Sequence, residues 1–172
     1  MVWITDDVML TSGTNGPARF YRLWDTRNLS KHVAQGSYSD GIGVTHLTCD
    51  HDHSVVYAHH RGEMQITVWK YNTASPSHMV PLETHTSPEP VKCFGVMPKW
   101  VIEPSKHEVI RAAKCTNKGN LEMLSFTMRN KSGLFQEDLY PVMKSNEPAG
   151  KYEDFAAGKD IKPKTFQIQE GY

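Results

Sequence analysis

Two tryptophans lie 45 residues apart in segments that are otherwise typical of short β-strands. Trp24 stands near the end of RFYRLWD (19–25), and Trp69 takes the matching place in QITVWKY (65–71). A repeat of this length, built from short strands, is typical of β-propeller blades, whose period is about 40–45 residues. The dipeptide Trp24-Asp25 is one that such blades often carry. The repeat therefore predicts an all-β chain built from stacked, four-stranded sheets.

β-type runs alternate with turn residues along most of the chain. Strands are expected at 8–13, 19–25, 32–38, 43–49, 54–60, 65–71, 78–84, 91–97, 107–114 and 121–128. The pattern of 107–114 fits a helix as well as a strand. A third repeat aligns Phe126 with Trp69 if PKWVIEPSK (98–106) is an insertion. In RFYRLWD, large apolar residues point to both faces, which suits a sheet stacked between two neighbours.

Residues 1–128 are thus expected to form about three propeller blades, although a β-sandwich also has short strands at regular spacing. Three blades cannot close a ring, because propellers usually have about four to eight. The chain is therefore predicted to be part of a propeller. Its first blade is expected to lack an innermost strand or to begin inside it at Trp3-Ile4, and its last blade to lack an outermost strand.

The β pattern stops after Met128. The remaining residues, 129–172, are predicted to form a C-terminal extension that contains a short helix within 151–160, ended by Gly158. A short strand is expected at 165–169, where apolar and polar residues alternate.

Charge and composition narrow the class of partner. Lys and Arg number 19, and Asp and Glu also number 19, so the basic excess that nucleic-acid binding usually needs is missing. No apolar run approaches the roughly 20 residues of a membrane span, and the N-terminus lacks the pattern of a signal peptide. Cys49, Cys93 and Cys115 are odd in number and widely spaced, which indicates buried free thiols in a reducing compartment. A soluble, cytoplasmic protein is expected.

A histidine-rich hairpin is the main candidate for metal binding. His51 and His53 lie in its turn, whereas His59 is expected at its far end, beside His46 of the neighbouring strand. Because a zinc site needs three or four converging ligands, this layout argues against one, and we expect neither a metal nor another cofactor. Motifs for nucleophilic catalysis and for phosphate binding are missing from the sequence, which favours a non-enzymatic protein.

Basic residues flank apolar strands in three segments: 18–22, 106–111 and 127–131. Such groups could attract an acidic partner and raise the rate of encounter, whereas isolated surface charges contribute little affinity. The alternative is that they are ordinary solvated charges.

The segment KSGLFQEDLYP (131–141) places four large apolar residues in a stretch with little regular pattern. These residues are Leu134, Phe135, Leu139 and Tyr140, and Pro141 follows them. Together with GVMPK (95–99), RLWD (22–25) and the closing helix and TFQIQEGY, this segment resembles coronins in the same order along the chain.

The resemblance implies a seven-bladed propeller followed by an extension that packs on one face of it. Residues 1–128 resemble blades five to seven, and 129–172 resemble the extension, with the four apolar residues as its anchors. A buried large side chain contributes about 1.5–3 kcal/mol, so four of them could hold such a segment in place.

The resemblance also implies a function. Coronins regulate the actin cytoskeleton by binding actin filaments, and the branched-filament nucleating complex is a second expected partner. Their basic N-terminal segment, earlier blades and coiled coil, through which the parent protein would oligomerise, have no counterpart in this sequence. The alternatives are a general propeller scaffold for protein partners and, less favoured, a histidine-rich metal-binding protein.

Overall fold

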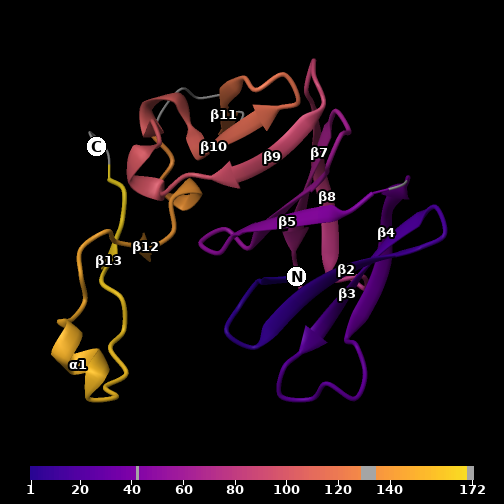
Figure 1. Cartoon of the computed structure of the whole chain (residues 1–172). Helices are drawn as coiled ribbons and strands as arrows, with labels where there is room; N and C mark the ends of the chain where they lie inside the picture. The colour runs from indigo at the N-terminus through magenta and orange to yellow at the C-terminus, as the bar shows by residue number, and fades with distance from the viewer. Residues whose placement is uncertain (42, 129–134, 170–172) are drawn as a thin grey trace. The chain divides into compact units, whose positions relative to one another are not determined.

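The computed structural model of the chain describes residues 1–41, 43–128 and 135–169, and nearly all of its regular structure is β (Figure 1). The first strands are β1 (Val2–Trp3), β2 (Val8–Asn15), β3 (Ala18–Asp25), β4 (Ala34–Asp40), β5 (Thr45–Asp50), β6 (Val55–His60), β7 (Gln65–Tyr71) and β8 (Met79–Thr86). Next come β9 (Val91–Val96), the 3₁₀ turns η1 (Lys99–Val101) and η2 (Pro104–Lys106), β10 (Glu108–Thr116) and β11 (Leu121–Thr127). The last elements are η3 (Glu137–Leu139), β12 (Met143–Lys144), α1 (Tyr152–Ala156) and β13 (Thr165–Phe166).

The chain divides into two compact units, which are described separately. The first unit holds residues 1–96 and 113–123, and the second holds residues 97–112 and 124–172. The predicted domain boundary after residue 128 stays a prediction. No helix among the described residues is long and apolar enough to cross a membrane.

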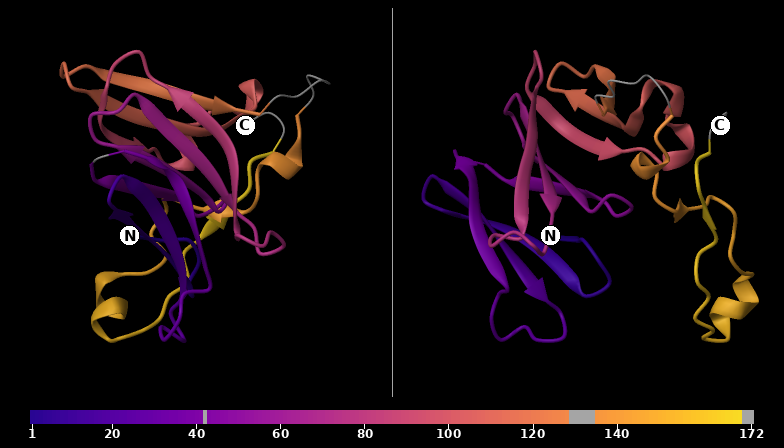
Figure 2. Two further views of the ribbon diagram at one scale, coloured as in Figure 1. Left: turned by 90° about the vertical axis from the view of Figure 1, so that its right-hand side faces the viewer. Right: turned by 180° about the vertical axis from the view of Figure 1, so that it is seen from behind.

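Two four-stranded sheets form the body of the first unit. Their strand orders are β1-β2-β3-β4 and β5-β6-β7-β8, and every neighbouring pair is antiparallel (Figures 1 and 2). The turn between β2 and β3 is Gly16-Pro17, where Gly16 adopts a φ of 60° that favours glycine. Strands paired in sequence order form up-and-down sheets like propeller blades, and the Greek-key connections of a β-sandwich are missing from these two sheets.

The two repeat tryptophans occupy equivalent positions. Each lies in the third strand of its sheet, Trp24 opposite Met9 and Trp69 opposite Val56. Both partners are the second residue of the preceding strand. The prediction of a structural repeat from the spacing of the tryptophans is therefore confirmed.

A hydrophobic core lies between these two sheets. Along β3, Tyr21 and Leu23 are buried, whereas Phe20, Arg22 and Trp24 are only partly buried on the opposite face. The buried side chains of the cluster are Ile4, Leu10, Tyr21, Leu23, Cys49, Val56 and Met79. The two faces expected from the alternation in RFYRLWD are therefore present, and the face with Tyr21 and Leu23 packs against the second sheet.

A third sheet has the strand order β11-β10-β9. The ambiguous segment 107–114 forms a strand, and the predicted insertion 98–106 forms the two 3₁₀ turns between β9 and β10. In the described part of the chain this sheet has three strands, whereas the first sheet has four, with the short strand β1 at one edge. That the first and the last blade are incomplete stays a prediction.

The second unit has its own small core. Its buried side chains are Ile102, Tyr140, Met143 and Ile168. The predicted helix is confirmed but is shorter, Tyr152–Ala156, and Gly158 follows it with a φ of 73°. The strand predicted at 165–169 is reduced to Thr165–Phe166, which pairs with β12.

Candidate interaction surfaces

The side chains of Trp24 and Asp25 connect the end of β3 to β2 and to the following turn by hydrogen bonds. Trp24 Nε1 donates a hydrogen bond to Thr11 Oγ1 at 2.9 Å, and its ring meets His32 edge-on at 5.9 Å between centroids. Asp25 accepts hydrogen bonds from the backbone N–H of Arg27 at 3.0 Å and from its guanidinium at 2.7 Å. Those bonds lower the pKa of Asp25 to about 2. These contacts stabilise the blade and give the dipeptide a structural role.

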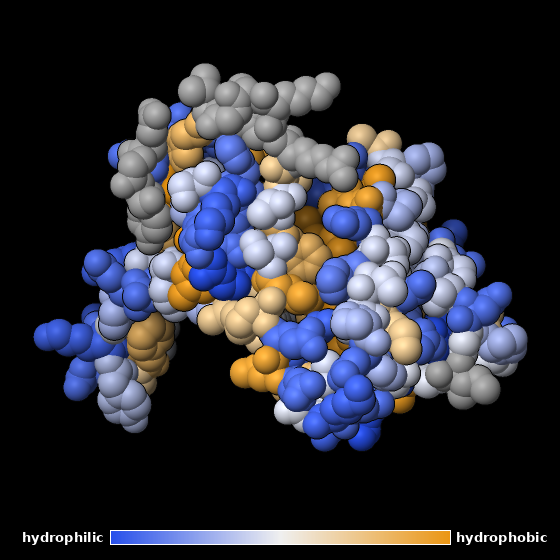
Figure 3. Space-filling model, turned by 90° about the horizontal axis from the view of Figure 1, so that it is seen from above, coloured by the Kyte–Doolittle hydropathy of each residue, from blue (hydrophilic) through white to orange (hydrophobic). Residues whose placement is uncertain are grey.

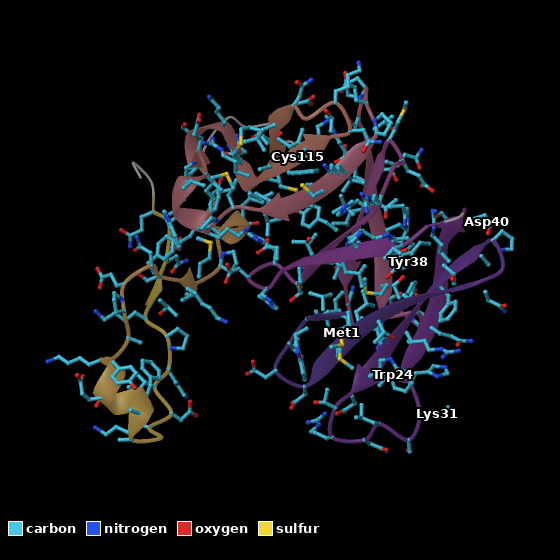
Figure 4. The ribbon with its side chains drawn as sticks, in the orientation of Figure 1. Met1, Trp24, Lys31, Tyr38, Asp40 and Cys115 are labelled. Carbon is cyan, nitrogen blue, oxygen red and sulfur yellow. The ribbon has the colours of Figure 1, made fainter. Side chains whose placement is uncertain are left out.

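Trp69 joins the first sheet to the second. Its ring lies 6.0 Å from that of Tyr21 and 5.8 Å from that of Tyr38, and the two tyrosine rings are 5.2 Å apart. Tyr38 comes from β4 and is labelled in Figure 4 together with Trp24. Aromatic groups at such distances add about 0.5–1.5 kcal/mol per pair beyond the area that they bury.

The basic segment 18–22 does not present its first arginine to a partner. Arg19 is fully buried and forms a two-pronged ion pair with Glu63, in which Arg19 Nη1 lies 3.2 Å from Glu63 Oε2. Arg22 lies over the ring of Phe20, with the guanidinium carbon 4.8 Å from the ring centroid. The segment lies in a strand, and the interpretation of Arg19 as a surface charge is wrong.

The second basic segment, 106–111, is also neutralised. Lys106 and Arg111 both pair with Glu103, and Arg111 Nη2 lies 2.6 Å from a carboxylate oxygen of the buried Glu108. Hydrogen bonds to Glu108 and Glu103 raise the pKa of Arg111. In the third segment, residues 129–131 lie outside the described residues.

The segment 135–141, here named the strap, docks through aromatic side chains. Tyr140 is buried, and its hydroxyl donates to the carbonyl oxygens of Glu108 at 3.2 Å and Pro104 at 3.3 Å. Phe135 stacks on Tyr140 with 5.5 Å between centroids and 7° between planes. Leu139 packs against the same cluster.

Two further residues of KSGLFQEDLYP, Leu134 and Pro141, were also predicted to belong to this anchored segment. Pro141 is partly buried, whereas Leu134 lies outside the described residues. The strap anchors onto η2 and the start of β10 by specific contacts, which the apolar residues of KSGLFQEDLYP alone could not reveal.

A shallow hollow of about 370 Å³ lies on the outer face of the first sheet. Its lining residues are Asn15, Ala18, Phe20, Arg22, Gln35, Gly36 and Ser37. Phe20 can lie flat because Gly13 has no side chain: a Cβ there would come within 2.7 Å of the Phe20 ring. Aromatic and arginine side chains are enriched in the centres of protein interfaces, so the hollow suits contact with another folded surface.

The histidines are separated as the sequence predicts. His46 stacks on His59 at 5.0 Å between centroids, whereas His53 Nδ1 lies 2.7 Å from Asp50 Oδ2 at the other end of the hairpin. Burial, followed by the nearby His46 and His60, lowers the pKa of His59 to about 4. Among the described residues, no group of three His, Cys, Asp or Glu side chains is placed to hold a metal ion.

The cysteines differ from the expectation of three buried thiols. Cys49 is buried, Cys115 is partly buried and Cys93 is exposed. The prediction is wrong for Cys93 because its side chain lies on the outward face of β9, a position that the apolar run VKCFGVM does not disclose.

Comparison with known proteins shows which known fold this chain resembles. A family model described as a type of WD40 repeat matches residues 121–163. The crystal structure of the WD40 domain from Toxoplasma gondii coronin superposes with a TM-score of 0.85 over 95% of this chain, at 23% sequence identity. The chain has the fold of part of a WD-repeat β-propeller. It spans 42% of the chain in that crystal structure, and this degree of identity establishes the fold alone.

Three of the predicted signature residues make contacts within the sheets. Trp24, Asp25 and Trp69 hold strands and sheets together. Figure 3 shows hydrophobic side chains at the surface among hydrophilic ones.

Proposed function

We propose that this chain is part of a coronin-type regulator that binds actin filaments in the cytoplasm and catalyses no reaction. Two independent lines support the proposal. The fold resembles that of a coronin WD40 domain over nearly the whole chain. The segment KSGLFQEDLYP, which carries the sequence resemblance, contributes the docked strap residues Phe135, Leu139 and Tyr140. The agreement between these two lines is the observation on which the proposal rests.

The outer face of the first sheet has a place in this proposal. Phe20 and Arg22 line an open hollow on a sheet whose other face is fully packed. In a closed propeller each blade packs between two neighbouring blades, so both faces of its sheet are covered. This face is therefore the contact for a preceding blade, and partners such as actin bind elsewhere, at loops and sheet edges. The branched-filament nucleating complex is the second proposed partner.

Filament co-sedimentation tests the proposal. The purified chain is spun with and without actin filaments at about 0.05 M and about 0.3 M salt, because exposed charges are screened more strongly at the higher value. We expect saturable pelleting with filaments at low salt and weaker pelleting at high salt. The spin without filaments corrects for self-association. A folded chain that stays in the supernatant at low salt would refute actin binding by this part of the protein.

A general propeller scaffold is the second candidate, and a specific observation favours it. The basic residues Arg19, Lys106 and Arg111 are all engaged with carboxylates, so they offer little attraction to an acidic filament. If this candidate is correct, filaments do not retain the chain at either salt concentration. The substitution Lys106→Gln is a matched control, since it removes an already compensated charge and should leave pelleting unchanged in either case.

A further inference from the structure

Strands β9 and β10 are neighbours in one sheet, and each carries a cysteine. Near the end of β9, the backbone N–H of Met97 donates to the carbonyl of Arg111 at 2.7 Å. Cys93 lies in β9 and Cys115 lies in β10. The side chains of these cysteines are also hydrogen-bonded to each other. Figure 4 labels Cys115 on this sheet.

The two thiols differ in access to solvent and in hydrogen bonding. Cys93 is exposed, whereas Cys115 is partly buried. The hydrogen bond with Cys93, burial and the nearby Cys93 charge raise the pKa of Cys115, against the opposing effect of Lys92. Cys93 is the more accessible of the two sulfurs, so it is the one that a dissolved disulfide can reach first.

We propose that Cys93 and Cys115 form a dithiol site that reacts with small-molecule disulfides and closes to a cross-strand disulfide. In the first step, the Cys93 thiolate attacks one sulfur of the small disulfide, whose S–S bond breaks and releases one thiolate. In the second step, Cys115 loses its proton and attacks Cys93 Sγ, and the second small thiol leaves. The two protein thiols are oxidised, and the small disulfide is reduced to two thiols.

The strand geometry suits this closure. Neighbouring strands of a sheet lie about 4.7–4.9 Å apart. Disulfides usually join Cα atoms about 4.4–6.8 Å apart, so the bond can form without separating the strands. Cys49 offers the contrast within the same chain, because burial, followed by the nearby Asp50, raises its pKa to about 12.

Oxidised glutathione and intact mass spectrometry test the proposal on the full chain. The wild-type protein should lose two hydrogen atoms in mass, retain no glutathione and regain its mass with excess dithiol reductant. Peptide mapping should join Cys93 to Cys115 and leave Cys49 unmodified. A persistent glutathione adduct on the wild type, or a disulfide that includes Cys49, would overturn the proposal.

Single substitutions assign the roles. Cys115→Ser should trap one glutathione on Cys93, since the second step is blocked. Cys93→Ser should slow thiol loss by about tenfold or more, because only less accessible thiols remain. Cys49→Ser is the matched control and should behave as the wild type. Cys93→Ser reacting as fast as the wild type would contradict the assignment, and circular dichroism checks that each variant is folded. If a variant is misfolded, the mass and the peptide map of the oxidised wild-type protein test the proposal in its place.

Discussion

Replacing Glu63 with glutamine removes a negative charge from beside the buried guanidinium of Arg19 and keeps the shape of the side chain. The side chain of Arg19 is 0% exposed and that of Glu63 is 36% exposed. Removing one partner of a fully buried pair costs about 3–5 kcal/mol, because the other charge stays buried without compensation. Since solvent reaches part of Glu63, we expect Glu63→Gln to lower the free energy of unfolding by about 2 kcal/mol.

Urea denaturation with a double-mutant cycle measures this effect. The cycle combines Glu63→Gln with Arg19→Met, which replaces the buried charge with an apolar side chain of similar length. The double variant should lose less stability than the sum of the singles, with a coupling of about 1–2 kcal/mol. Asp7→Asn is the matched control, because Asp7 pairs with Arg27 at the surface and should change stability by less than about 0.5 kcal/mol. Glu63→Gln costing no more than Asp7→Asn, or a coupling near zero, would refute the reasoning.

Three further predictions concern the strap, the histidines and the sheet edge. Tyr140→Phe should cost about 1 kcal/mol through the lost hydroxyl bonds, and Tyr140→Ala about 3–5 kcal/mol through the cavity, both by urea denaturation; equal costs would contradict the contacts. His59 has a pKa of about 4 in the folded chain against 6.5 ordinarily, so the unfolded chain binds its proton first and stability should fall as pH drops through that window. His59→Phe should flatten this part of the stability curve, and an unchanged curve would exclude His59 as its source. The edge strand β11 has one neighbour in the described sheet, so light scattering should show concentration-dependent self-association, and a monodisperse monomer would count against it.

The repeat could be predicted from sequence because it depends on local pattern. Trp24 and Trp69 lie in short alternating runs bounded by turns, and such runs specify strands and their faces without distant partners. The segment 107–114 was ambiguous because its periodicity is weak, and pairing with β9 and β11 on either side makes it a strand.

The roles of the charged residues could not be predicted in the same way. Arg19 is buried because Glu63 lies beside it, and these two residues are 44 positions apart in the sequence. Lys114 is buried as well, since its ammonium meets Ser87 Oγ at 2.5 Å and Glu122 at 3.0 Å. Such pairings are properties of the folded sheets, so a sequence read segment by segment assigns these groups to the surface.

The strap could be predicted from the sequence only in part. Its apolar residues indicated an anchored segment, and the bonds from the Tyr140 hydroxyl to the Pro104 and Glu108 carbonyls supply the docking site. Phe135 and Leu139 are partly buried against Tyr140, and Leu139 ends the short 3₁₀ turn η3.

The stacking of the first two sheets as neighbouring blades is tested most directly by nuclear Overhauser effects between their aromatic side chains. Tyr21 and Tyr38 belong to the first sheet, and Trp69 belongs to the second. With ring centroids 6.0 Å and 5.8 Å from that of Trp69, both tyrosines should show cross-peaks to the indole protons. A folded chain in which Trp69 has no cross-peak to either tyrosine would contradict the stacked-blade architecture.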